Sequence, residues 1–259
     1  MVLEYIISAK TAEREPWEMF FLGLIYTSVA VPLALWIFPS QASATAILFV
    51  VIASLPIVLS LFRHEEDVAE KQGLKHHKAT IPFFVFFFLG LVLAFTLWHV
   101  FLPAELSAKL FSTQENTISE ITGNAIASGV SFNTILVNNF KVLAIAVILS
   151  VLYGAGAVFI FAWNASVIAA AVGAVVRNLG HAAIGVGLLR CLLHGVPEIT
   201  GYFMGGLAGG IISFAIIRHR FKSKKFSKAL LDAADLTLAA IILLVVAAFL
   251  EVNISPLIR

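Results

Sequence analysis

The sequence carries very little charge. Only 12% of its 259 residues are Asp, Glu, Lys or Arg, whereas 60% are hydrophobic. A soluble domain usually carries about a quarter charged residues, so this composition argues against an ordinary water-soluble fold. Long stretches contain no charged residue at all, among them 19–62, 80–103, 142–176 and 199–217. The chain is therefore predicted to be an integral membrane protein.

Cysteine is nearly absent as well. Cys191 is the only one, so the chain cannot form an internal disulfide. The HExxH and GxSxG motifs of hydrolases and a phosphate-binding glycine loop are also missing. An intramembrane metal-dependent hydrolase is consequently the least favoured function, with weak candidate ligands at His99, His181, His194 and Glu198. The sequence identifies no cofactor and gives no indication of nucleic-acid binding.

What the sequence does contain is a series of long apolar runs. A helix that spans the hydrocarbon of a bilayer needs roughly 20 such residues, and these runs are continuous rather than alternating. The predicted fold is an all-α polytopic transmembrane helix bundle that forms a single domain over 1–259. The first run is a full span without a small-residue cleavage site after it, so we expect no cleavable signal. The seven predicted spans are Phe20–Phe38, Thr45–Phe62, Ile81–Leu102, Thr134–Leu152, Ala157–Val176, Val196–Ile217 and Leu236–Glu251.

The basic residues predict the orientation of this bundle. The N-terminal tail, the loop after the second span and the loop after the sixth hold two, four and six of the 17 Lys and Arg residues. With seven spans, these three segments lie on the same side of the membrane. The positive-inside rule then predicts that the N-terminus lies in the cytoplasm and the C-terminus outside.

The connection at 103–133 is predicted to lie on the outer side. Leu106, Leu110 and Phe111 recur at helical spacing among charged residues. This pattern is typical of one or two amphipathic helices lying on the membrane surface.

Three ionisable residues interrupt the apolar run at 188–212, namely Arg190, His194 and Glu198. The segment around them is too long for one straight span, and Gly195 and Pro197 are helix breakers. We therefore expect a short broken or re-entrant helix at about 182–193, followed by the sixth span. The alternative is one continuous, proline-kinked helix, in which the three ionisable residues stack on one face at i, i+4 and i+8.

A second set of polar residues lies in the fourth and fifth spans, at Asn138, Asn139, Lys141 and Asn164. All but Asn164 are predicted at the depth of His194 and Glu198, in the outer half of the bundle. Polar residues inside a membrane often mark a functional site, although asparagines can also simply fix helix register. We favour a joint Asn–Lys–His–Glu site. Downstream, Gly201, Gly205 and Gly209 form a small-residue ridge, which is typical of close helix packing.

These motifs carry a family resemblance. The double asparagine of "NNFK", the intramembrane asparagine and "HGVPEI" ahead of a glycine-rich helix resemble the stage II sporulation protein M family over about 130–255. The resemblance assigns the signature positions to Asn138, Asn139, Asn164, His194, Gly195 and Glu198. It implies a polytopic plasma-membrane protein without an established catalytic activity, whose founding relatives act in a complex that remodels peptidoglycan during spore engulfment. It leaves the first three spans, 1–102, outside the match and makes 134–259 the family-like half.

Two functions of different classes compete. The first is a non-enzymatic scaffold or membrane-complex component, surrounded by the lipid bilayer and partnered either by copies of itself or by other membrane proteins. The second is a transporter or channel for an ion or small solute, in which the Asn, Lys, His and Glu side chains bind the cargo. The two functions can be distinguished by whether the polar residues line a water-accessible cavity.

Overall fold

A computed structural model of the protein describes residues 15–72, 80–119, 131–154, 156–179, 184–219, 221 and 223–254. Every regular element within these ranges is a helix, which confirms the predicted all-α bundle. A short helical stretch also covers 112–119. The helices are α2 (Glu18–Ile37), α3 (Ala42–Gln72), α4 (Thr80–Phe101), α5 (Ala104–Leu110), α7 (Phe132–Tyr153), α8 (Ala157–Leu179), α9 (Ile184–Arg218) and α10 (Lys224–Asn253).

Among the described residues, seven helices are long and apolar enough to cross a membrane, and they coincide with the seven predicted spans. Two of them extend well beyond the apolar run that defined them. Helix α3 continues to Gln72, and α10 already begins at Lys224. Both extensions are rich in good helix formers, and Ser223 caps α10 by accepting a hydrogen bond from the Phe226 amide at 3.1 Å. Which end of the bundle faces the cytoplasm stays a prediction.

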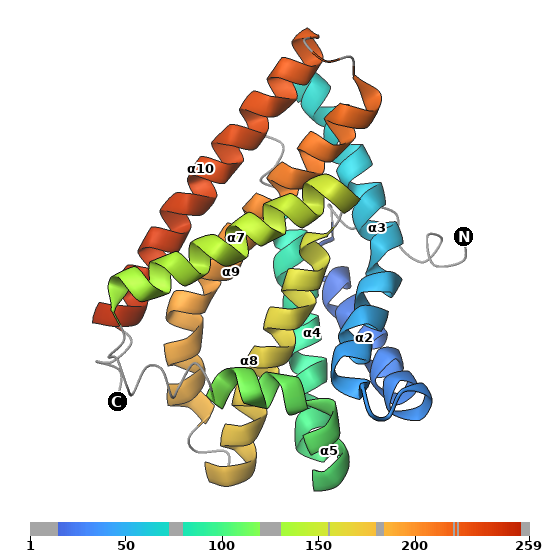
Figure 1. Ribbon diagram of the computed structural model, residues 1–259, viewed down its shortest axis with the longest axis vertical. Coiled ribbons are helices and arrows are strands. Elements are labelled where there is room, and N and C mark those ends of the chain that lie inside the picture. The colour runs from blue at the N-terminus through green and yellow to red at the C-terminus, as the bar shows by residue number, and fades with distance from the viewer. Residues whose placement is uncertain are drawn as a thin grey trace.

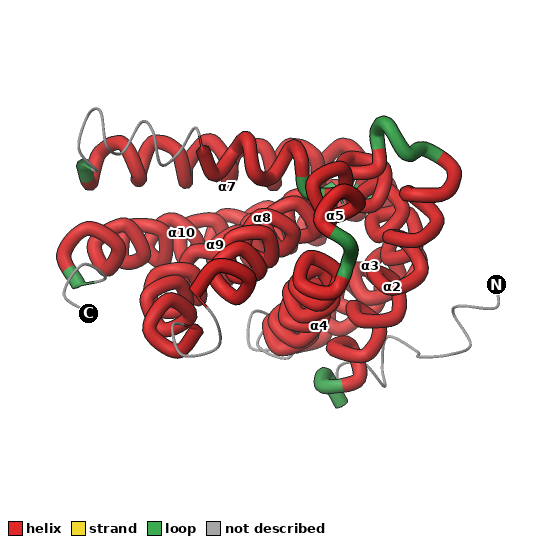
Figure 2. The backbone as a smooth tube through the Cα atoms, turned by 90° about the horizontal axis from the view of Figure 1, so that it is seen from below, coloured by secondary structure: helices red, strands yellow, loops and turns green. Residues whose placement is uncertain are grey.

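Helix α9 is the centre of the C-terminal half of the molecule. It is the most buried of the seven spans, and it contacts α7, α8 and α10. Figure 1 shows α7 running obliquely across α9, and Figure 2 shows α7 as an outer layer beside the other helices. Helix α7 is the least buried of the seven spans.

Helices α2 and α4 approach each other through glycine. A Cβ placed on Gly23 would lie only 2.6 Å from the carbonyl oxygen of Phe87, so the two backbones touch at this point. Further along, aromatic rings join α4 to α8 and α9. The ring of Phe203 lies 5.4 Å from that of Phe84 and 4.3 Å from that of Phe161, centroid to centroid.

The predicted break before the sixth span is wrong, because α9 is a single helix from Ile184 to Arg218. Pro197 lies inside it, as the alternative interpretation required. At 1.5 Å per residue its 35 residues extend roughly 52 Å, well beyond the hydrocarbon thickness. Gly195 and Pro197 would readily end a helix in water, but an unpaired backbone is far costlier inside a bilayer, where proline is tolerated within spans.

The connection after α4 does contain amphipathic helices, and we call α5 together with residues 112–119 the cap. Leu110 and Phe111 are buried, whereas Leu106 remains 37% exposed. Gln114 fixes the cap to the bundle, because it accepts a hydrogen bond from Ser43 of α3 at 2.8 Å and donates one to Ser166 of α8 at 3.0 Å. The remainder of the predicted connection, 120–130, lies outside the described residues.

Candidate functional site

A buried polar cluster lies where α7, α9 and α10 meet. Glu198 and Tyr202 are one turn apart on α9, and the Tyr202 hydroxyl is 2.9 Å from Glu198 Oε1. The same hydroxyl is 3.3 Å from Oδ1 of Asn139 on α7. Tyr202 is 1% exposed and Asn139 is 3% exposed. The three side chains therefore form one hydrogen-bonded unit, in which Tyr202 and Asn139 are buried and Glu198 is partly buried.

The hydrogen-bond donors and acceptors of this unit do not match in number. A tyrosine hydroxyl has one proton to donate, and here it faces two acceptor oxygens. The amide nitrogen of Asn139, Nδ2, is buried without any hydrogen-bond partner. A buried donor left unpaired costs about 1–3 kcal/mol, so the described groups leave this cluster incomplete.

A second carboxylate reaches the cluster from α10. Glu251 lies within electrostatic range of Glu198 and Tyr202, and it also interacts with His194 of α9. Two acidic side chains from different helices thus share one buried region, with a histidine beside one of them. Glu251 itself is only partly buried, so the cluster reaches the surface close to the last turn of α10.

Sequence reasoning did not include Tyr202 or Glu251 in the site, although both left a signal. Tyr202 follows Glu198 by four residues, the spacing that places two side chains on one helix face. Glu251 is the only charged residue between Leu236 and Ile254, and an isolated charge in such a run is unusual.

The predicted site residues do not all come together. Asn139 and Glu198 belong to the cluster, and His194 interacts with Glu251 beside it. Asn138 and Lys141 are exposed on α7. Asn164 donates from Nδ2 to the Ile160 carbonyl of its own helix at 2.7 Å. Arg190 lies on α9 two turns before Glu198, but its side chain lies outside the described part of the chain.

The glycine ridge of α9 lies against two neighbouring helices. A Cβ on Gly201 would meet Leu244 of α10 at 3.1 Å, and a Cβ on Gly205 would collide with Leu143 of α7. At Gly209 it would lie 2.7 Å from the Ser150 Cβ of α7. The absence of side chains at these positions lets α7 and α10 approach α9 closely, which encloses the polar cluster.

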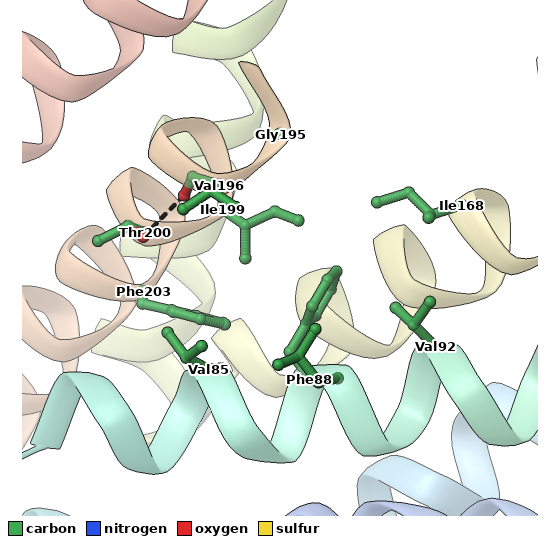
Figure 3. Close-up of a pocket in the computed structure, with 10 residues that line it drawn as sticks. Val85, Phe88, Val92, Ile168, Gly195, Val196, Ile199, Thr200 and Phe203 are labelled. Carbon is green, nitrogen blue, oxygen red and sulfur yellow. Dashed lines mark hydrogen bonds between the residues drawn. The ribbon is translucent and has the colours of Figure 1, made fainter. Parts of the chain in front are cut away.

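Gly195 has a different environment. Within 4 Å, a Cβ there would meet nothing. It lines an apolar cavity of about 180 Å³ between α4, α8 and α9, together with Val85, Phe88, Ile168, Ile199 and Phe203 (Figure 3). Thr200 also lines this cavity but turns its hydroxyl to the Val196 carbonyl of its own helix, at 2.7 Å. The cavity is therefore apolar, on a different face of α9 from Glu198.

The candidate metal ligands that the structure describes do not form a metal site. Among the described residues, no three His, Cys, Asp or Glu side chains lie close enough together to hold a metal ion. His99 lies under the cap, where its Nε2 is 3.5 Å from Glu115 Oε1 and its ring is 4.8 Å from that of Phe111. His181 lies outside the described residues. The hydrolase hypothesis therefore gains no support from the geometry.

Comparison with known proteins places these features in a family. The family model described as stage II sporulation protein M matches residues 79–256. This range runs from α4 to α10, so the third span belongs to the match, contrary to our expectation. An uncharacterized protein of the archaeon Methanocaldococcus jannaschii is 26% identical over 149 residues, which cover 54% of this chain and 83% of that protein. No solved structure matches. The family model covers well over half of a multi-pass helical membrane protein, and the chain belongs to the stage II sporulation protein M family.

Proposed function

We propose that this protein is a non-enzymatic component of a membrane-protein assembly, and that the exposed face of α7 binds its partner. The observation that carries the proposal is the polar content of this face, because Asn138 and Lys141 are exposed on a membrane-spanning helix. The buried residues of α7 form a single stripe, made of Asn139, Leu143, Ala146 and Ser150.

Lys141 points away from that stripe. It follows Asn139 by two residues, which at 3.6 residues per turn places it about 200° around the helix axis. A lysine facing hydrocarbon costs about 2.5–3.5 kcal/mol at the middle of a span and less where it can reach the interface. A partner helix that presents a carboxylate at this level would offset the cost.

An apolar groove beside this face could receive the rest of such a helix. It has a volume of about 390 Å³ and lies between α7 and α10, lined by Phe140, Leu143, Ala144, Val147, Ile148, Thr237 and Ile241. Membrane helices associate by close packing together with a few polar contacts. The groove and Lys141 together provide both features.

Site-specific photo-crosslinking in native membranes tests this proposal. A crosslinking amino acid replaces Ile145 on the exposed face of α7 or, as a control, Ile25 on α2, and both native side chains are about half exposed. We expect one discrete protein adduct from position 145 and only lipid adducts from position 25. The adduct should be lost with Lys141→Leu and retained with Lys109→Leu, because Lys109 is exposed on α5 outside the spans. Equal adducts from both positions, or an adduct indifferent to Lys141, would contradict the assignment.

Transport of an ion or small solute is the second candidate function. It is favoured by Glu198, a carboxylate held between helices within a span, since such residues commonly mark ion pathways. Ion flux into proteoliposomes, compared between wild type and Glu198→Gln, tests it directly.

A further inference from the structure

We propose that the cluster of Asn139, Glu198, Tyr202 and Glu251 is a binding site for a monovalent metal cation such as Na⁺. This assignment is independent of the partner surface on α7. It rests on two separate observations, which are the two carboxylates that α9 and α10 bring together and the unpaired amide of Asn139.

The unpaired amide identifies the kind of ligand. The oxygen and nitrogen of an asparagine amide are distinguished only by their hydrogen-bond partners. If the amide is reversed, its NH₂ group donates to the Tyr202 oxygen, and the Tyr202 hydroxyl gives its single proton to Glu198. Both donors at this point, the Asn139 NH₂ group and the Tyr202 hydroxyl, then have an acceptor. The Asn139 oxygen takes the buried position that the nitrogen had, and it has no hydrogen-bond partner there.

A positively charged ligand would stabilise this unpaired Asn139 oxygen. A proton alone does not complete the cluster, because a protonated Glu198 would donate to Tyr202 and Tyr202 to Asn139, leaving Nδ2 unpaired as before. A metal cation would use the Asn139 oxygen and the Glu198 carboxylate together, with Glu251 adding negative charge. Such oxygen ligands suit hard cations.

The described ligands favour a singly charged ion. Divalent Mg²⁺ and Ca²⁺ take six or more oxygen ligands, and Mg²⁺ demands near-ideal octahedral geometry. The side chains of Asn139, Glu198, Tyr202 and Glu251 carry six oxygens, but the Tyr202 oxygen and Glu198 Oε1 already take part in the hydrogen bonds described above, which leaves four. His194 also interacts electrostatically with Glu251. A partly hydrated monovalent ion makes smaller demands on the site.

Among the described residues, the cluster reaches the surface beside Glu251, which is partly exposed near the last turn of α10. Beyond Tyr202 along α9, Gly205 and Gly209 lie in close contact with α7. A cation could therefore enter beside Glu251 and stop at Asn139. This arrangement fits a bound ion that fastens α7 and α10 to α9, rather than an ion passing through.

Thermal unfolding of the full chain in detergent at pH 8 provides the test, followed through its four tryptophans. NaCl is titrated against choline chloride at constant ionic strength, with radioactive ²²Na⁺ binding as the second readout. We expect a saturable rise in Tm of several degrees with Na⁺ and one bound ion per chain, because a ligand of the folded state stabilises it by mass action. Glu198→Gln should abolish both, whereas Glu105→Gln, on the exposed part of α5, should leave both unchanged.

Glu251→Gln is the second variant and should weaken Na⁺ binding at least tenfold, which keeps the test valid if Glu198→Gln does not fold. Identical Tm values in Na⁺ and choline for the wild type would overturn the proposal. A stability that follows pH but not Na⁺ would also overturn it, since the cluster would then take up only a proton. Saturable Na⁺ binding that survives both glutamine variants would place the ion elsewhere and equally reject this site.

Discussion

Two buried polar clusters of the molecule are built in a similar way but differ in charge and in how completely their polar groups are paired. Beneath the cap, Ser43 donates to Gln114, Gln114 donates to Ser166, and Ser166 donates to the Trp163 carbonyl at 2.7 Å. Each cluster joins side chains from different helices. In the cap cluster each of these donors has an acceptor and no group is charged, whereas the α7–α9–α10 cluster contains two carboxylates and an unpaired amide.

This difference separates a structural network from a candidate binding site. A fully satisfied neutral network stabilises the fold, because removing one side chain leaves the buried polar groups of its neighbours unpaired. An incomplete cluster with excess negative charge weakens the isolated protein and persists where a ligand completes it. We therefore expect opposite effects on stability when the two clusters are altered.

The largest effect should follow Gln114→Leu. This substitution removes two buried hydrogen bonds and leaves the Ser43 hydroxyl without its acceptor. We expect a loss of about 3 kcal/mol in the free energy of unfolding. Thermal unfolding in detergent, beside Ser112→Ala at an exposed cap position, measures it. A loss below about 1 kcal/mol would mean that the cap cluster is not the structural network we describe.

The next largest effect on stability should come from the helix packing around the α7–α9–α10 cluster. Two glycines of α9 test it. Gly209→Ala forces a methyl group against the Val147 carbonyl and Ser150, and should cost about 1–3 kcal/mol. Gly195→Ala meets nothing within 4 Å and should stabilise α9 by up to about 1 kcal/mol. Unfolding curves of the two variants should therefore shift in opposite directions. Equal shifts would show that α7 and α9 are not held at this close distance.

Glu198→Gln should have a smaller effect on stability in the absence of Na⁺. The glutamine keeps an acceptor for the Tyr202 hydroxyl and removes a buried negative charge near Glu251. We expect the variant to be as stable as the wild type or more stable by about 1 kcal/mol. Unfolding in choline chloride measures this. A loss comparable to that of Gln114→Leu would make Glu198 a structural residue and remove the contrast between the clusters.

The sequence alone predicted the spans well because hydrocarbon thickness and continuous apolar runs constrain them strongly. Glu198, His194 and Asn139 stood out because a polar residue is conspicuous in such runs, and the structure places them near one another. The sequence did not predict that Lys141 faces outward while Asn139 faces inward, because this depends on which side of α7 packs against α9. The sequence also did not predict that α9 is continuous. Glycine and proline readily end helices in water, whereas the bilayer favours an uninterrupted helix.

Substitution of a third glutamate, Glu105, should have the smallest effect on stability. Glu105 is exposed on α5, where Lys109 donates to it at 2.8 Å, and this hydrogen bond and charge lower the pKa of Glu105. A lowered pKa in the folded state stabilises the fold above the ordinary pKa, and this contribution disappears as pH falls through the lowered value. Because water surrounds both side chains, we expect Glu105→Gln to leave Tm unchanged within error at pH 7, and wild type and variant to converge fully at lower pH. A clear loss of stability at pH 7 would show that an exposed ion pair supports the cap, and that burial is not what distinguishes Glu198 from the other glutamates.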